Sequence, residues 1–222
     1  MNKKLKFING SPLANLLKSR SAIFSLSLRK YSHPSELYQA VKLAISTIGE
    51  CDFSLCDSIQ RYNYVWQKNL SLNEGHTQAN QEGDFWIHWF TALFKDEPIK
   101  PNILKWDYWL DQPDFPEQKN FIDQLYEKDA LFKNTIEESI VRFLRRYTAN
   151  PNHAAFDIEQ AKKMSREIVK EETAVLILQA QKKYDFEIFV EKRNPGLQYV
   201  YENIVWQQHP FLLQPILIKI TL

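Results

Sequence analysis

The chain has 222 residues, a length typical of one globular domain. Hydrophobic residues make up 44% and charged residues 25%, which excludes a wholly disordered or a collagen-like chain. Lys and Arg number 28 against 27 Asp and Glu, a formal net charge of +1. A contact with nucleic acid must therefore come from a local basic patch and not from the overall charge.

The two cysteines favour neither a disulfide nor a metal site. Cys51 and Cys56 are five residues apart in one predicted strand, so their side chains are expected on opposite faces. The five histidines show no ligand spacing, and the chain has no G-x-G-x-x-G or Walker loop. We therefore expect no metal and no cofactor.

No apolar run is long enough to be a membrane span, which needs about 18 residues. The basic start MNKKLKF is followed by a stretch too short and too polar for a signal-peptide core. We expect a cytoplasmic, monomeric protein that does not enter a membrane.

The first part of the chain reads as a strand, a helix and a second strand. Residues 22–27 form a short apolar run, and Pro34 opens an amphipathic helical pattern that continues to Gly49. A strand pattern follows at 51–57. The unit has the length of a βαβ crossover, which predicts parallel strands.

The alternation continues to the end of the chain. After a polar stretch at 67–83, the predicted elements are a helix at 84–95, a strand at 102–106, helical sequence at 116–147 with a break near Asp129, a helix from a cap at Asp157 to about Lys183, a strand at 184–190, a short helix at Asn194-Pro195, and a last strand interrupted or edged by Pro215. This order predicts an α/β, doubly wound, mostly parallel sheet with an added helical layer. We expect one domain over 1–222, with residues 1–20 flexible.

Ser27 is a candidate nucleophile. Ligands of open parallel sheets bind at the carboxyl ends of the strands, and the first predicted strand ends at Ser27. The amino end of the following helix, with its free N–H groups, could stabilise an oxyanion there. The alternative is a serine that only completes a turn, since the sequence lacks a G-x-S-x-G elbow.

Glu172 is a candidate proton-transfer group. Its neighbours three and four residues away are all apolar: Ile168, Val169, Val175 and Leu176. Desolvation on such a face raises the pKa of a carboxylate toward neutral pH. The adjacent Glu171, which faces Glu167 and Ala174, is predicted to be more solvated. The alternative is that Glu172 is buried in an ion pair with a partner such as Arg61.

Other polar residues could line a pocket or hold phosphates. The segment after the second strand supplies Asp57, Gln60, Arg61 and Asn63, which could form a polar wall or only cap a helix. Basic residues gather in two places: Arg142, Arg145 and Arg146 near a helix end, and Lys3, Lys4 and Lys6 at the amino terminus. Both groups could bind phosphates, although cations at a helix end also complement its dipole.

Together these residues resemble the tRNA-dependent cyclodipeptide synthases, whose Rossmann-like domain is similar to that of class I aminoacyl-tRNA synthetases. The resemblance spans roughly residues 22–205. It rests on the strand end S-L-S at Ser27 and on further motifs in this order: D-S-I-Q-R-Y-N at 57–63, G-D-F-W-I at 83–87, W-D-Y-W at 106–109, E-E-T-A-V at 171–175 and N-P-G at 194–196.

The resemblance implies a ping-pong reaction on two aminoacyl-tRNAs that releases a cyclic dipeptide. Ser27 would carry the aminoacyl group, and Glu172 would hold its amino group and assist proton transfer. No cofactor is implied, because the tRNA ester is already activated. The predicted substrate-binding residues are Lys30, His33, Asp57, Gln60, Arg61, Asn63, Glu171 and Asn194. The helix that is often arginine-rich in relatives, here 84–95, is nearly uncharged, so the predicted tRNA-binding residues are the two basic groups.

The sequence departs from the family at two tyrosines. Ile168 and Asn194 stand where relatives have tyrosine, and Tyr31, Tyr184, Tyr199 or Tyr201 could replace the missing phenols. The family has two subfamilies: one has asparagine at the position of Lys30, and the other varies there. Lys30 therefore favours the second, more variable subfamily. The departures leave open a non-catalytic relative that only binds tRNA or aminoacyl-tRNA. A hydrolase that uses Ser27 is a third reading, without a triad partner that spacing alone can identify.

Overall fold

The computed structural model describes residues 4–7, 21–27, 34–48, 50–98, 100–150, 153, 155–189, 194–208 and 212–221. Its strands form one sheet in the order β1-β6-β5-β2-β3-β4. The strands are β1 (Lys4–Phe7), β2 (Ser21–Ser27), β3 (Glu50–Cys56), β4 (Asn102–Lys105), β5 (Phe186–Phe189) and β6 (Gln214–Thr221). Neighbouring strands are parallel except for β1, which is antiparallel to β6.

The strand order reverses at β2. The chain runs outward from β2 to β3 and β4, then crosses to β5 and β6 on the other side of β2. This is the doubly wound topology predicted from the alternating elements, with its switch point between β2 and β5.

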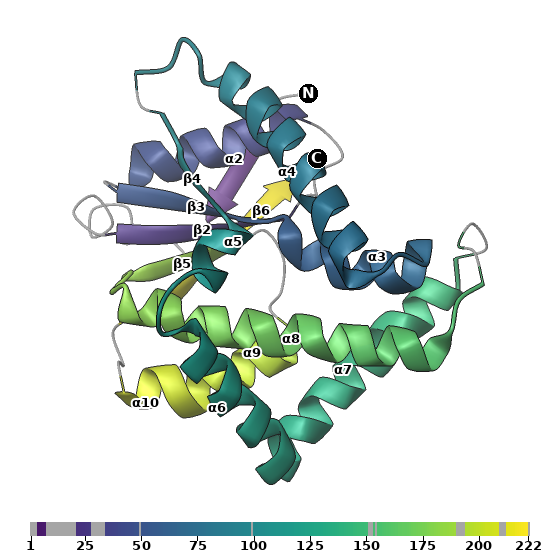
Figure 1. Cartoon of the computed structure of the whole chain (residues 1–222). Coiled ribbons are helices and arrows are strands. Elements are labelled where there is room, and N and C mark those ends of the chain that lie inside the picture. The colour runs from purple at the N-terminus through teal and green to yellow at the C-terminus, as the bar shows by residue number, and fades with distance from the viewer. Residues whose placement is uncertain are drawn as a thin grey trace.

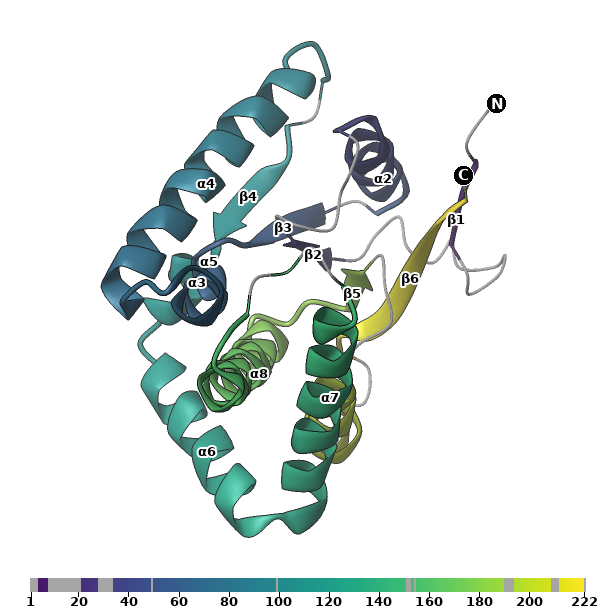
Figure 2. The same cartoon turned by 90° about the vertical axis from the view of Figure 1, so that its right-hand side faces the viewer.

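The helices cover both faces of the sheet and add a further layer (Figures 1 and 2). They are α2 (Pro34–Thr47), α3 (Arg61–Lys68), α4 (Leu72–Leu93), α5 (Trp106–Leu110), α6 (Phe115–Lys128), α7 (Ala130–Thr148), α8 (Ile158–Gln181), α9 (Pro195–Val200) and α10 (Trp206–Gln208). A 3₁₀ turn, Ser58–Gln60, precedes α3, and a π-helical turn, Tyr201–Val205, joins α9 to α10.

Side-chain alternation along β2 assigns the two faces. Ala22, Phe24 and Leu26 pack in one core with residues of α2 and α4, whereas Ile23 packs in a second core with α8. Figure 2 shows α6 and α7 on the side of α8 away from the sheet. The predicted additional helical layer is confirmed.

Several local predictions are confirmed. Asp129 separates α6 from α7 and caps α7 by accepting a hydrogen bond from the backbone N–H of Phe132 at 2.9 Å. Asp157 caps α8 in the same way, 2.9 Å from Glu159 N and 3.1 Å from Gln160 N. Both cysteines are free and pack against different cores, as their spacing predicts.

The polar stretch at 67–83 was predicted wrongly. Helix α4 begins at Leu72, where Ser71 and Glu74 form a capping box, and α3 precedes it. Gly75 and Gly83 suggest helix breakers, yet they mark close approaches. A Cβ atom at Gly75 would lie 2.9 Å from the carbonyl oxygen of Arg61, and one at Gly83 would lie 2.4 Å from Asp57 Oδ2.

The two ends of the chain meet in the sheet. Residues 4–7 form β1 at its edge, and the flexibility expected for residues 1–20 stays a prediction. Of the two alternatives for Pro215, the second is confirmed: Pro215 edges the last strand, as the second residue of β6, and is paired in register with Glu187. Strand β1 pairs only with Ile218–Thr221, so the proline removes no hydrogen bond from that pairing.

Candidate active site

Three parallel strands bring polar residues to one edge of the sheet. Strand β2 ends at Ser27, which is in register with Cys56 at the end of β3, and β4 ends at Lys105. Ser27 is half-buried. It shares the face of Ile23 and Ser25, which is the face that α8 covers. The predicted nucleophile thus lies at the carboxyl edge next to the switch point, where ligands of such sheets bind.

A buried polar cluster forms around Glu171 at this edge; we call Glu171, Arg61, Tyr62 and Trp106 the Glu171 cluster. Glu171 is 2% exposed. Its Oε2 accepts hydrogen bonds from Arg61 Nη2 and, at 3.0 Å, from the Tyr62 hydroxyl, while Oε1 accepts one from Trp106 Nε1 at 2.8 Å. Burial and the charge of Glu171 raise the pKa of Tyr62, so its phenol stays protonated and donates.

The Glu171 cluster corrects two expectations. Glu171 is buried, although it was predicted to be the more solvated carboxylate, because α3 and α5 cover its side of α8 and neighbours along one helix do not reveal this. Arg61 pairs with Glu171, so the ion pair considered for Glu172 is formed by its neighbour.

Helix geometry shows where Glu172 lies. Successive residues on a helix are about 100° apart. Lys170 faces α6, with Nζ 3.1 Å from Asp123 Oδ1. Glu171 faces α3 and α5, and Val169 faces α9, since a Cβ atom at Gly196 would lie 3.0 Å from Val169 Cγ1.

The half-buried Glu172 therefore lies on the arc of α8 between Glu171 and Val169. That arc faces the sheet, which lies directly over α8 in Figure 2. Because Glu171 contacts Trp106, the residue after β4, this part of α8 is level with the carboxyl edge. Ser27 and Glu172 thus belong to facing surfaces of the sheet and α8.

The Asp57 side chain lies on the other face of the sheet, the one covered by α2 and α4. It follows Phe53 and Leu55 in alternation and is fully buried, with Oδ1 accepting a hydrogen bond from the backbone N–H of Trp106 at 2.8 Å. Its Oδ2 lies 3.6 Å from Lys105 Nζ and packs against Gly83. Burial raises its pKa, against the hydrogen bonds and the nearby lysine. These contacts join the end of β3 to the start of α5.

The other predicted pocket residues lie at the start of α3, at the cap of α9, or outside the described residues. Asn63 Nδ2 donates to Gln60 Oε1 at 2.8 Å, and the buried Asn63 Oδ1 has no hydrogen-bond partner. Asn194 caps α9, accepting from Gly196 N at 2.8 Å. Lys30 and His33 lie outside the described residues.

Two of the candidate replacements for the missing phenols hydrogen-bond to carboxylates elsewhere in the fold. The Tyr184 hydroxyl bonds to Asp52 Oδ2 at 2.5 Å, near the amino end of β3, and the Tyr199 hydroxyl bonds to Asp129 Oδ2 at 2.5 Å, between α6 and α7. Tyr201 is buried beside Trp206, and Tyr31 lies outside the described residues. Tyr62, which lies in the D-S-I-Q-R-Y-N motif and is predicted from the sequence as a candidate wall of the pocket, donates from its hydroxyl to Glu171 Oε2 at 3.0 Å.

The sequence did not point to Trp106 or Glu187 as part of a polar site. Trp106 opens the W-D-Y-W motif, so the motif was noticed without the role of its indole. Glu187 is 7% exposed on β5, and its Oε1 accepts a hydrogen bond from Ser25 Oγ at 3.2 Å. A glutamate inside the apolar strand pattern YDFEIFV was the available signal.

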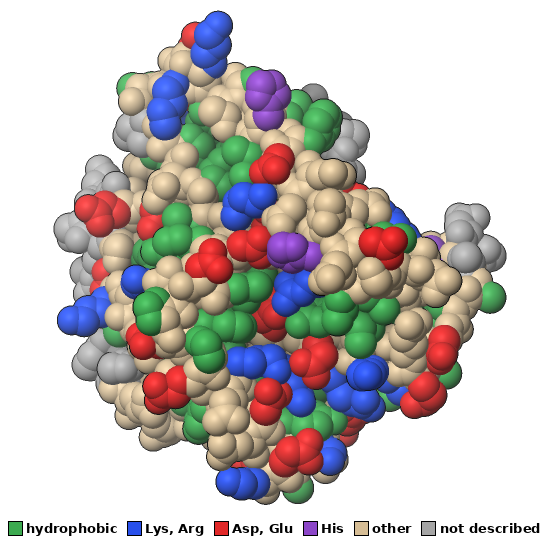
Figure 3. Space-filling view, viewed as in Figure 1, with side chains coloured by type: hydrophobic (Ala, Val, Ile, Leu, Met, Phe, Trp, Pro, Cys, Tyr) green, Lys and Arg blue, Asp and Glu red, His purple; other side chains and the backbone are tan. Residues whose placement is uncertain are grey.

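The predicted basic residues lie on two elements. Arg142, Arg145 and Arg146 are exposed on one side of α7, and Arg142 Nη2 is 3.6 Å from Glu138 Oε2. Lys4 and Lys6 are in β1, and Lys3 lies outside the described residues. On the face drawn in Figure 3, basic and acidic side chains are interleaved, in keeping with the net charge of +1.

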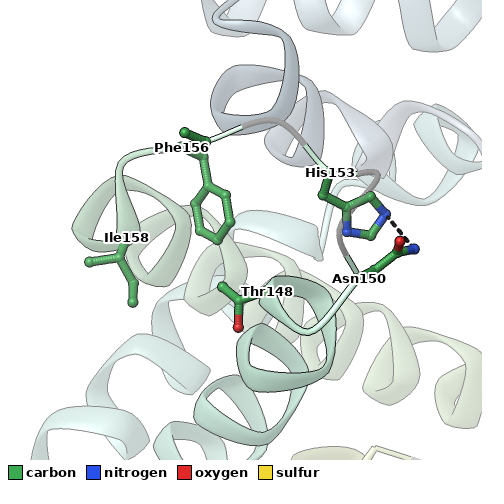
Figure 4. Close-up of a pocket in the computed structure, with 6 residues that line it drawn as sticks. Thr148, Asn150, His153, Phe156 and Ile158 are labelled. Atoms are coloured by element: carbon green, nitrogen blue, oxygen red, sulfur yellow. Dashed lines mark hydrogen bonds between the residues drawn. The ribbon is translucent and has the colours of Figure 1, made fainter.

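A separate cavity of about 270 Å³ lies at the turn from α7 to α8 (Figure 4). It is lined by Thr148, Asn150, His153, Ala155, Phe156 and Ile158. The His153 ring stacks on Tyr147 with centroids 3.6 Å apart. The cavity adjoins the arginine-bearing end of α7 and not the strand ends.

Within the described ranges, no three His, Cys, Asp or Glu side chains are grouped so that they could hold a metal ion. None of the helices in that part of the chain is long and apolar enough to cross a membrane.

No protein-family model and no curated protein sequence matches the chain. Solved structures do. A CDPS, or cyclodipeptide synthase, from Fluoribacter dumoffii is 26% identical, with a TM-score of 0.90 over 100% of both chains. A cyclodipeptide synthase from Candidatus Glomeribacter gigasporarum, solved bound to Phe-tRNAPhe, is 18% identical, with a TM-score of 0.67 over 95% of this chain and 92% of that one.

A Mycobacterium tuberculosis protein, whose structure relates cyclodipeptide synthetases to type I tRNA synthetases, is 10% identical, with a TM-score of 0.63 over 98% of this chain and 93% of that one. The two more distant proteins show a shared fold.

Proposed function

We propose that the chain is a cyclodipeptide synthase, a tRNA-dependent aminoacyltransferase like its structural neighbours, and that it joins two aminoacyl groups into a cyclic dipeptide through an aminoacyl-Ser27 intermediate. The observation that carries the proposal is the placement of Ser27 at the carboxyl edge beside the switch point, on the face that α8 covers. Ligands of doubly wound sheets bind at this edge.

The proposed reaction needs no redox step and no further activation. The Ser27 hydroxyl attacks the ester carbonyl of the first aminoacyl-tRNA, and the terminal ribose hydroxyl of that tRNA leaves with a proton. The amino group of the Ser27 ester attacks the second aminoacyl ester and releases the second tRNA. The new terminal amino group then attacks the Ser27 ester, which closes the ring and frees the hydroxyl.

Each step moves a proton from an attacking group to a leaving oxygen, and we assign this transfer to Glu172. Its position on the sheet-facing arc of α8 supports the assignment, as does its apolar surrounding of Val169, Val175 and Leu176, which are 4%, 1% and 2% exposed. Glu172 would also hold the amino group of the bound aminoacyl ester. Glu171 is assigned a structural role, since both of its carboxylate oxygens accept hydrogen bonds within the Glu171 cluster.

The tRNA itself is proposed to contact the exposed arginines of α7 and the lysines of the amino-terminal strand. Arginine side chains three and four residues apart on one helix face suit successive phosphates. The polar residues Lys30, His33, Gln60, Asn63 and Asn194 stay predictions for the aminoacyl end. Asp57, Arg61 and Glu171, predicted for the same role, have polar groups engaged within the protein.

Expression in a bacterium followed by mass spectrometry of the medium tests the activity. Cyclic dipeptides should accumulate with the wild-type chain and not with Ser27→Ala. With purified protein and radiolabelled aminoacyl-tRNA, label should stay covalently attached to wild type only. Soluble wild-type protein that makes no cyclic dipeptide in either assay contradicts the proposal.

A second candidate is a relative that binds aminoacyl-tRNA without joining amino acids. What favours it is that Ile168 and Asn194 stand where the resemblance implies tyrosines, while the hydroxyls of Tyr184 and Tyr199 are bonded to Asp52 and Asp129. The radiolabel assay separates the two. Retention of tRNA on a filter without covalent label on Ser27 would support the binding protein.

A further inference from the structure

The Glu171 cluster places a charged pair where the fold does not require one. The Arg61 and Glu171 side chains are 13% and 3% exposed, and burying both charges costs about as much free energy as their attraction returns. Apolar side chains of similar size would often stabilise such a site as well or better. What a hydrogen-bonded buried pair adds is a defined geometry.

The donors of this cluster are fixed to the carboxyl ends of two strands. Arg61 Nη1 also donates to the carbonyl oxygen of Ser58 at 3.0 Å, shortly after β3. Trp106 follows β4 directly, and its backbone N–H is held by Asp57. Tyr62 lies under the Arg61 guanidinium, with its ring centroid 4.3 Å from Arg61 Cζ. The acceptor, Glu171, belongs to α8, between 65 and 110 residues away in sequence.

The rotation of α8 about its axis is thereby set from two sides. Lys170 is held at α6 by Asp123 and by the Tyr126 ring, whose centroid lies 4.4 Å from Lys170 Nζ. Glu171 is held at α3 and α5. With two successive residues fixed, the next residue, Glu172, can only face the sheet.

We propose that Tyr62, together with Arg61 and Trp106, is a positioning residue that locks Glu171 and so directs Glu172 at the aminoacyl group on Ser27. This inference rests on the proposed function. In this proposal Tyr62 acts through Glu171, to which its hydroxyl donates at 3.0 Å, and its phenol serves in place of the one that the resemblance implies at Ile168. A misplacement of about 1 Å can cost roughly 100-fold in rate, so the loss of one phenol contact is measurable.

A double-mutant cycle tests the proposal. The variants are Tyr62→Phe, Glu172→Gln and the combination, measured by kcat for cyclic dipeptide and by affinity for aminoacyl-tRNA. Tyr62→Phe should lower kcat about 10- to 100-fold with little change in affinity. In the Glu172→Gln background the same change should alter kcat within about twofold, because the group being positioned is already inactive.

Tyr64→Phe is the matched control. Tyr64 is on the same helix, is 1% exposed, and its hydroxyl donates to Glu82 away from the Glu171 cluster. It should affect thermal stability as much as Tyr62→Phe while leaving kcat within about twofold. Two results would overturn the positioning role. One is an equal loss of kcat in Tyr62→Phe and Tyr64→Phe. The other is a Tyr62→Phe effect on kcat that is the same with Glu172 and with Glu172→Gln.

A crystal structure of Tyr62→Phe gives a readout that does not need activity. The Glu172 carboxylate should move away from the end of β2. An unmoved carboxylate overturns the inference even if the wild-type chain proves inactive. An inactive wild type with a displaced Glu172 would instead refute the proposed function and leave the positioning role supported.

Discussion

Glu171 and Glu172 are adjacent on α8 but lie in different surroundings. Glu171 is an acceptor for three donors in a buried ion pair, while Glu172 faces the sheet from an apolar stretch of helix. A carboxylate that stabilises structure and one that moves protons respond differently to the same substitution, because an amide keeps the size and loses the charge.

Glu172→Gln should lower cyclic-dipeptide formation by about 10²- to 10⁴-fold, the usual contribution of proton transfer, while the protein still folds. Glu171→Gln is the comparison for stability, and its activity should fall as well because Glu171 orients Glu172. It leaves Arg61 without its counter-charge and should lower the free energy of unfolding by about 3 kcal/mol. Product assays and thermal melts of both variants check this. If only Glu171→Gln loses activity, and does so at unchanged stability, we have assigned the wrong carboxylate.

Asp57 makes folding stability depend on pH. Burial raises its folded pKa above the ordinary 3.8, so the folded state holds this proton more tightly than the unfolded state does. Its contribution to stability is therefore complete below 3.8 and is lost as the pH rises through the folded pKa. Asp57→Asn removes this pH-dependent loss of stability, because the amide does not titrate. Its side-chain oxygen can still accept the hydrogen bond from the Trp106 backbone N–H.

The free energies of unfolding of wild type and Asp57→Asn are measured in urea at several pH values. The range is about pH 3.5 to 7, over which a carboxyl group with a raised pKa loses its proton. The difference in free energy should shift in favour of the variant as the pH rises. A difference that is constant over this range, or that shifts toward wild type, would contradict the assignment.

At the scale of elements, α4 depends on a close approach to the end of β3. An added Cβ at Gly83 would lie 2.4 Å from Asp57 Oδ2 and 2.7 Å from Asp57 Cβ, and the fully buried Asp57 cannot give way. An alanine in the interior of a helix normally gains about 1 kcal/mol over glycine. The close approach to Asp57 turns this gain in stability into a loss at Gly83.

Gly83→Ala should destabilise the protein by about 1–3 kcal/mol, as overpacking does. Gln81→Ala, an exposed change on the same helix, should be neutral or slightly stabilising. Free energies of unfolding in urea compare the two. A more stable Gly83→Ala protein would mean that α4 can move away from Asp57.

At the scale of the whole molecule, a chain with a net charge of +1 must hold a strongly anionic substrate by local cations. The arginines of α7 are exposed and lie at one side of the helical layer. Each phosphate contact releases counterions, so binding weakens with salt in proportion to the number of contacts.

Replacing Arg142, Arg145 and Arg146 with glutamine should weaken tRNA binding and make the slope of log K against log salt shallower by about one to three contacts. Lys128→Gln, an exposed cation at the end of α6, should leave the slope unchanged. Filter binding between 50 and 200 mM salt, about the range in which such effects are large, measures both. An unchanged slope in the triple variant would place the tRNA elsewhere.

The sequence alone was sufficient for the order of elements around β2, α2 and β3, the helix caps at Asp129 and Asp157, the doubly wound class and the position of Ser27. Each depends on contacts within a few residues or on a periodicity that one segment carries. The amino-terminal half of α4 could not be predicted in this way. Its glycines allow close contacts with Arg61 and Asp57, which are distant from them in sequence.

The surroundings of the two glutamates were decided only by the tertiary structure. Spacing along α8 shows which residues share a face, but not which other element covers that face. Arg61, Tyr62 and Trp106 reach Glu171 because β3 and β4 end at the same edge of the sheet and α8 passes beneath it. Burial of a charged side chain depends on such distant partners, and the folded chain supplies them.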